Sequence, residues 1–363
     1  MTTNAMPWSY TLLAGFAFAA FCGCSADGGS SSGLGTGGRA GTTNNATGGA
    51  GGSGNNVGGT GGNVSDYKPV SVTNSGNLYT LQMGRIKMVI DASVGARITE
   101  FSLDGSNVLT GPEVDVATHA NYGSTFWPSP QNWSWPPATG AAVDTAAYTG
   151  SVDAPANSIQ LVSGNTDIKS GATVLGSIAV TKKFVAVPDS GAVDVTYTIE
   201  NVSATATYSV APWQISRVAG TSGAITFYGQ GTGTRTAPAA MQFIDQDGIS
   251  WYNFVASPTA DLKAKSDGAG WIAHVTSDKL LLLFEYPDIA ANQAAPNEAE
   301  VEIYTGKNGN YIEVEPQGAY TAVPPGGTLE WTVRWKLRQI DASVEIAAGS
   351  ATLEAFAQQS RNQ

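Results

Sequence analysis

The most regular pattern in the sequence is an alternation of apolar and polar residues, which begins after Asp66 and recurs in short runs to about residue 340. Runs such as "LYTLQM", "IKMVID", "AVDVTYTIENV" and "TLEWTVRWKL" repeat every two residues, which places alternate side chains on opposite faces of a β-strand. Gly, Asn and Asp separate the runs, as expected for turns. About fifteen or more strands, without an internal linker or a repeat of fixed period, predict an all-β fold, one large antiparallel β-sandwich over residues 66–340.

The end of the chain has a different pattern. From Asp341 to Gln359 the sequence "DASVEIAAGSATLEAFAQQ" has helical spacing, and Asp341 is a residue type that caps helices. We therefore expect residues 341–363 to form a C-terminal helix and tail.

One stretch interrupts the strand pattern. The segment "YGSTFWPSPQNWSWPP", residues 122–137, contains Trp127, Trp133 and Trp135 together with four prolines. Because proline lacks a backbone donor and fixes φ, the segment is predicted to be a shaped loop rather than a strand or helix. Its tryptophans can serve as a stacking platform for the apolar face of a ligand or as a plug at one end of the core, and the sequence leaves both open.

The N-terminus has the features of an export signal. Ten apolar residues, Leu12 to Phe21, are too few to span a bilayer but suit the core of a signal peptide. The following "CGC" resembles a bacterial lipobox, which implies removal of residues 1–23 and lipidation of Cys24. Ser25 implies, by the same resemblance, sorting to the outer membrane of a bacterial envelope. No Lys or Arg precedes the apolar run, so a plain signal peptide, a different start or a Cys22–Cys24 pair remain alternatives.

Composition and net charge indicate a tether and limit the expected partners and cofactors. Residues 24–65 are almost entirely Gly, Ser, Thr and Asn, which predicts a flexible tether. The net charge of −11 argues against nucleic acid and anionic lipid as partners, leaving a lipid anchor as the expected membrane contact. No cysteine follows Cys24, and two dispersed histidines make no metal motif, so we expect neither disulfides, metal nor other cofactor in the folded part.

Three stretches together resemble the galactose mutarotase-like superfamily. They are "VGARITEFSLDGSNVL" (94–109), the tryptophan segment, which is similar to the DUF4380 branch, and "YIEVEPQGAYTAVPPGGTLEWTVRW" (311–335). The resemblance spans roughly Tyr67 to Arg338. It implies an antiparallel β-supersandwich that binds or processes sugars. Independently of it, Asp104-Gly105 predicts a two-residue hairpin turn with positive φ.

The resemblance also implies chemistry. Aldose epimerases use a carboxylate base and a histidine acid, and Glu315 matches the base by motif, with Glu313 two residues away on the same strand face. Trp213 and Gln214 stand where the epimerase histidine would be. His119, just before the tryptophan segment, is the replacement acid to consider, whereas His274 alternates with apolar neighbours and is expected to be structural.

Since the sugar-binding elements are retained and the acid is missing, the sequence favours a carbohydrate-binding protein. An aldose epimerase-like enzyme using Glu315 and His119 is one alternative. A polysaccharide lyase or hydrolase recruiting Tyr122, Arg97 or Asp115 and a structural envelope protein are the others. The sequence does not indicate the sugar or the oligomeric state. The expected sugar-binding residues are Arg97, Trp127, Gln131, Trp133, Trp135, Trp213, Gln214 and Glu313.

Overall fold

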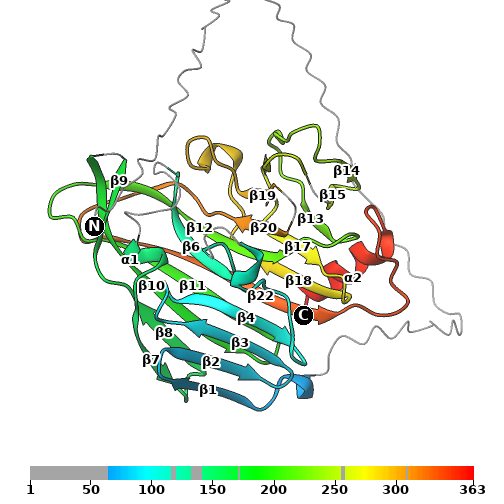
Figure 1. Ribbon diagram of the computed structural model, residues 1–363, viewed down its shortest axis with the longest axis horizontal. Coiled ribbons are helices and arrows are strands. Elements are labelled where there is room, and N and C mark those ends of the chain that lie inside the picture. Colours follow the sequence, from blue (N-terminus) through cyan, green and yellow to red (C-terminus); the bar gives the residue numbers. More distant parts are fainter. Residues whose placement is uncertain (1–63, 116–119, 132–140, 171, 255–257, 308–309) are drawn as a thin grey trace, which may run out of the picture. The chain divides into compact units, whose positions relative to one another are not determined.

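The computed structural model describes residues 64–115, 120–131, 141–170, 172–254, 258–307 and 310–363. Within these ranges the chain forms 22 β-strands, divided equally between two sheets of 11 strands (Figure 1). All neighbouring strands pair antiparallel. The predicted all-β fold, a large antiparallel sandwich with a short C-terminal helix, is confirmed.

The first sheet has the strand order β1-β2-β3-β4-β6-β12-β20-β19-β16, with β5 paired to β4 and β21 paired to β12. Its strands are β1 (Val70–Ser75), β2 (Leu78–Met83), β3 (Ile86–Asp91), β4 (Arg97–Leu103), β5 (Ser106–Asn107), β6 (Ser124–Ser129), β12 (Tyr208–Ala219), β16 (Leu262–Ser266), β19 (Val301–Thr305), β20 (Tyr311–Pro316) and β21 (Thr321–Val323).

The second sheet has the order β14-β15-β13-β17-β18-β22-β11-β10-β8-β7, with β9 paired to β10. Its strands are β7 (Thr149–Asp153), β8 (Ser158–Val162), β9 (Thr166–Ser170), β10 (Thr173–Val187), β11 (Ala192–Asn201), β13 (Ile225–Gly229), β14 (Phe243–Gln246), β15 (Ile249–Asn253), β17 (Trp271–Val275), β18 (Leu280–Glu285) and β22 (Thr328–Gln339).

Helices are few and short in the described ranges. They are the 3-10 helices η1 (Val64–Tyr67), η2 (Pro112–Val114) and η3 (Ala291–Gln293), and the α-helices α1 (Ala141–Asp144) and α2 (Ala351–Arg361). None of them has the length and apolar character needed to cross a membrane.

The two sheets meet in the main hydrophobic core. Phe126 of β6 stacks on Tyr197 of β11 with ring centroids 4.3 Å apart, and Phe101 of β4 meets Trp335 of β22 edge-on at 5.3 Å. These rings are fully buried. Because the side chains alternate along each strand, residues next to these core positions face the other side of the first sheet, where a second set of contacts is built.

The Asp104-Gly105 hairpin turn is confirmed. It joins β4 to β5, with φ of 52° at Asp104 and 83° at Gly105, both in the left-handed region that this turn type requires.

The prediction that residues 122–137 contain no strand is wrong for their first half. Ser124–Ser129 is β6, and Pro128 lies opposite Pro212 of β12. Arg217 N donates to Gly123 O, and hydrogen-bonded and non-hydrogen-bonded pairs alternate along an antiparallel ladder. The two prolines therefore face each other at a non-hydrogen-bonded pair, where neither missing N–H belongs to the ladder between these strands.

The predicted start of the C-terminal helix is also wrong. Residues 341–350 form turns, and α2 begins at Ala351 after Ser350, whose Oγ accepts a hydrogen bond from Leu353 N at 3.3 Å. Gly349, with φ of 78°, precedes this cap in a conformation that a helix cannot continue. From Ser350 onward the helix buries Leu353 and Ala357 against the second sheet, and Figure 1 shows it beside β18.

A pocket over the charged face of the first sheet as candidate functional site

Five adjacent strands of the first sheet, β6, β12, β20, β19 and β16, carry mostly apolar side chains on the face toward the main core and mostly polar or aromatic side chains on the other. On β20, Ile312 and Val314 belong to the main core, whereas Glu313 and Glu315 alternate with them and share the opposite face, as expected from the sequence.

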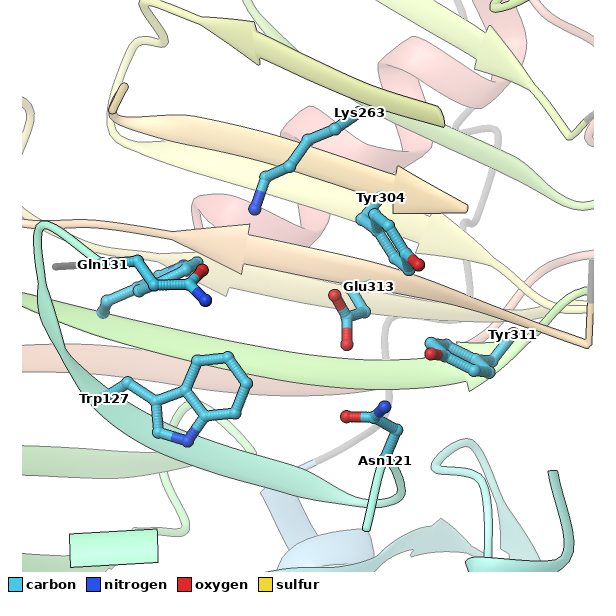
Figure 2. A pocket seen from close by; sticks show the side chains of 8 residues that line it. Asn121, Trp127, Gln131, Lys263, Tyr304, Tyr311 and Glu313 are labelled. Carbon is cyan, nitrogen blue, oxygen red and sulfur yellow. The ribbon is translucent and has the colours of Figure 1, made fainter. Parts of the chain in front are cut away.

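On this polar face the structure has a pocket of about 210 Å³. This volume is below the roughly 300–1,000 Å³ of pockets for drug-sized ligands and suits a ligand of about one sugar ring. Figure 2 shows the Glu313 carboxylate at its centre, with Trp127 on one side and Tyr304 and Tyr311 on the other. The lining residues are Asn121, Trp127, Gln131, Trp213, Lys263, Tyr304, Tyr311 and Glu313.

Trp127 and Trp213 form one wall of the pocket. They are opposite residues on β6 and β12, and their rings meet edge-on with centroids 5.4 Å apart. With Ile215 they make a small apolar cluster separate from the main core. Trp127 is 6% exposed and Trp213 is 1% exposed, so each ring packs against protein while an edge contributes to the pocket wall.

At the pocket wall, Lys263 contacts two buried carboxylates. Its Nζ is 2.6 Å from Glu302 Oε2 and 3.0 Å from Glu315 Oε2, and both glutamates are fully buried. Glu315 Oε2 also accepts a hydrogen bond from Trp213 Nε1 at 2.9 Å. Burial raises the pKa of Glu302, Lys263 opposes this shift and Glu315 adds to it. One ammonium thus holds two carboxylates and, through Glu315, the indole of the pocket wall.

Glu313 is the carboxylate that reaches the pocket. Its Oε1 accepts a hydrogen bond from Arg217 Nε at 2.8 Å, and Arg217 Nη1 donates to Thr125 Oγ1 at 3.0 Å. Burial raises the pKa of Glu313, and the nearby Glu315 charge raises it further, although the Arg217 guanidinium lowers it. A carboxyl group whose pKa is raised in a pocket is a candidate for accepting and returning a proton.

A further ion pair borders the pocket near Gln131. Lys265 Nζ is 2.6 Å from Glu298 Oε2 and 3.5 Å from Glu302 Oε1, while the backbone N–H of Gln131 donates to Glu298 Oε1 at 3.2 Å. The end of the described tryptophan segment is thereby fixed to the charged face.

Only some of the residues expected at the sugar site line the pocket. Trp127, Gln131, Trp213 and Glu313 line the pocket, whereas Glu315 lies behind it. His119, Trp133 and Trp135 lie outside the described residues.

Two expected binding residues point elsewhere. Gln214 faces the core, where its Oε1 accepts hydrogen bonds from Tyr197 and Trp335, each at 3.0 Å. Arg97 is buried and does not line the pocket. Its Nη1 donates to Ala120 O at 2.5 Å, so it supports the loop that carries Asn121 to the pocket.

His274, expected to be structural, lies on β17 at 1% exposure. Its Nδ1 is 2.9 Å from Thr226 Oγ1. Burial lowers its pKa to about 3, which keeps the imidazole neutral at physiological pH.

Sequence reasoning missed Lys263, Tyr304, Tyr311, Asn121 and Arg217. Lys263 and Tyr304 alternate with apolar residues on short strands, which is a readable signal of a polar strand face. Their meeting near Glu313 depends on which strands pair and in which register, which the alternation does not specify. Within the described ranges, no group of three or more His, Cys, Asp or Glu side chains has a metal-binding arrangement.

Comparisons with known proteins show similarity in fold. No protein-family model and no curated protein matches the sequence. A TPR-domain containing protein from Parabacteroides distasonis aligns over 75% of this chain and 49% of its own, with 11% identity and a TM-score of 0.51.

Galactose mutarotase-like proteins are also similar in structure. The one from Lactobacillus casei aligns over 72% of this chain and 100% of its own, with 9% identity and a TM-score of 0.49. The one from Clostridium acetobutylicum aligns over 75% and 99%, with 10% identity and a TM-score of 0.46. At these identities the likeness concerns the fold and carries no information about ligand or chemistry.

The Lys263 ion pairs generate a stability prediction. Lys263→Met should leave Glu302 and Glu315 buried together without their ammonium, at a cost of about 3–5 kcal/mol in the free energy of unfolding. In the variant, burial and the Glu315 charge raise the pKa of Glu302 in the folded state without opposition from Lys263, so the loss should be small below about pH 4.3 and grow as pH rises. Urea unfolding at low and high pH measures it, relative to wild type at the same pH.

Lys183→Met, which removes an exposed lysine of β10, is the matched control and should change stability little at either pH. An equal loss for Lys263→Met at both pH values would contradict the assignment of its cost to the two carboxylates.

Proposed function

We propose that the protein binds a carbohydrate in the pocket over the first sheet. The observation that carries this proposal is the meeting of indole and phenol side chains from Trp127, Tyr304 and Tyr311 around the Glu313 carboxylate in a space of one sugar ring (Figure 2). Aromatic side chains pack against the C–H face of a pyranose, and carboxylate and amide groups bond its hydroxyls.

The sequence supplies a further argument for a sugar ligand, because three of its stretches resemble the galactose mutarotase-like superfamily. We propose membership of that superfamily on the motifs, and of its DUF4380 branch on the tryptophan segment alone. A purely structural envelope role is less well supported, because Glu313 reaches the pocket even though Glu315 does not.

Removing a pocket ring should weaken sugar binding. Trp127→Ala and Tyr304→Ala should each reduce affinity for a bound monosaccharide by about 1–2 kcal/mol, roughly 5–30-fold, because an aromatic contact with the sugar is lost. Isothermal titration calorimetry measures the affinity, and circular dichroism checks that each variant folds.

Tyr320→Ala is the control, since it removes a 37% exposed aromatic residue that does not line the pocket. If Tyr320→Ala weakened binding as much as the pocket variants did, the proposed location would be wrong.

A second candidate function is aldose epimerase-like catalysis. The raised pKa of Glu313 in the pocket favours it, since a base needs such a group. Glu315, the base implied by the motif, is instead fully buried and bonded to Trp213 and Lys263. The strand that would supply the acid presents Trp213 to the pocket, and an indole does not donate a proton at neutral pH.

Polarimetry of freshly dissolved glucose or galactose separates binding from catalysis. We expect no acceleration of anomer exchange beyond the uncatalysed rate. Rapid exchange that is abolished by Glu313→Gln, with sugar binding retained, would establish the enzyme and assign Glu313 as its base.

We also propose that the protein is exported and anchored by lipid at Cys24, on the outer membrane of a bacterial envelope, with residues 24–65 as a tether. The support is the sequence of the first 65 residues. Cys24→Ala should therefore release the protein from the membrane fraction or block its processing. Intact-mass analysis of the mature protein measures the modification, and an unmodified Cys24 would refute the anchor.

A further inference from the structure

From the charges around the pocket we infer that its ligand is a sugar bearing a free, protonated amino group, bound through the Glu313 carboxylate and the rings of Tyr304 and Tyr311. This inference rests on the proposed sugar-binding function and names the class of sugar.

The cations near the pocket are already paired. Lys263 is bound by Glu302 and Glu315, and Arg217 by Glu313. With the Lys265–Glu298 pair, the charged face holds three cations and four carboxylates. There is therefore one carboxylate more than there are cations, and because burial raises the pKa values of Glu302 and Glu313, a bound cation would stabilise their ionised forms.

That excess is presented to the ligand by Glu313. Glu302 and Glu315 are fully buried beneath the pocket, whereas Glu313 is 8% exposed and lines it. Arg217 Nε is 2.8 Å from Glu313 Oε1, so Oε2 is the oxygen with room for a further donor. An ammonium group there would complete the charge balance with a charge-assisted hydrogen bond.

Two phenol rings flank this carboxylate. Tyr304 lies directly opposite Glu313 across the β19–β20 pair, and Tyr311 precedes Glu313 by two residues on the same face. Their ring centroids are 6.3 Å apart with an angle of 37° between the planes. A carboxylate beside two aromatic rings is an arrangement that attracts ammonium groups through ion pairing and cation–π contact.

The surroundings of both phenols are acidic. Burial raises the pKa of Tyr304, and Asp261 and Glu313 raise it further. Burial likewise raises the pKa of Tyr311, with Glu313 and Asp115 adding to the shift and Arg217 opposing it. The carboxylates of Glu313 and Asp261 thus lie near both phenols, where they would favour a cation beside the rings.

Acidic sugars are disfavoured by the same pairing. A uronate or sugar phosphate needs a cation whose charge is not already neutralised, and Lys263 and Arg217, the cations at this pocket in the described part of the chain, are held by carboxylates. An anion beside either cation would meet the carboxylates that already hold it, and their repulsion opposes its binding.

Calorimetry with matched sugar pairs tests the inference. Glucosamine, galactosamine and mannosamine are compared with glucose, galactose and mannose, and with glucuronate and N-acetylglucosamine. At least one amino sugar should bind about tenfold or more tightly than its neutral partner. N-acetylglucosamine, which lacks the positive charge, should not bind more tightly than glucose. Glucuronate should bind most weakly.

Substitutions test whether Glu313 causes the preference for amino sugars. Glu313→Gln keeps the shape of the side chain and should bring the ratio of amino-sugar to neutral-sugar affinity close to one. Glu200→Gln removes an exposed carboxylate of β11 and should leave the ratio unchanged. If Glu313→Gln does not fold, Tyr304→Leu provides the second test, since loss of its ring should lower the same ratio.

The pH dependence gives an independent readout. Glu313 is faced by Arg217, Lys263, Tyr304, Tyr311 and Glu315, and its raised pKa leaves it partly protonated where an ordinary glutamate is ionised. An ammonium ligand favours the ionised form, so amino-sugar affinity should increase as pH rises through that pKa, with proton release on binding. Neutral-sugar affinity should not increase.

The outcomes are distinguishable. Tryptophan-dependent binding of neutral sugars without preference for an amine would overturn this inference and leave the carbohydrate proposal intact. Absence of binding by every sugar tested would overturn both. Choline binding as tight as that of the best amino sugar would replace the amino-sugar site with a general ammonium site.

Discussion

The ion pairs of Lys263 with Glu302 and Glu315 are the constraint on which the rest of the site depends. Two buried carboxylates on neighbouring strands would repel each other and resist ionisation if they were left alone. The contacts of 2.6 Å and 3.0 Å to one ammonium offset this repulsion and hold both carboxylates in place. Glu315 then receives the indole N–H of Trp213, which fixes one wall of the pocket. The shape of the pocket wall therefore depends on this group of buried charges.

The register of the strands places the pocket side chains next to one another on one face of the sheet. Lys263 pairs with Tyr304, Tyr304 with Glu313, and Glu313 with Arg217, so that one row of side chains crosses four strands. A shift of one residue in any of these pairings would move its side chains to the core face. The pocket carboxylate, its guanidinium partner and the flanking phenol thus depend on the same hydrogen-bonded ladders.

The sequence predicted the layers of the fold better than the site. Period-two alternation identified most strands, the positive-φ turn at Asp104 and the shared face of Glu313 and Glu315, because these are local properties. The prediction for β6 was wrong, because the donor that Pro128 lacks is at a position where the ladder with β12 needs none. Sequence reasoning missed Lys263, because its partners are 39 and 52 residues away and only tertiary pairing joins them. Trp127, expected as either platform or plug, is packed at its face and open at the pocket edge.

The central claim is that a sugar ring occupies the pocket over this charged face. The most direct measurement is a crystal structure of the protein grown with glucosamine and, separately, with glucose. The account predicts a sugar in contact with Trp127 and Tyr304, with a polar group of the ligand at hydrogen-bond distance from Glu313. A sugar bound at another place, with the pocket closed by its own side chains, would contradict it.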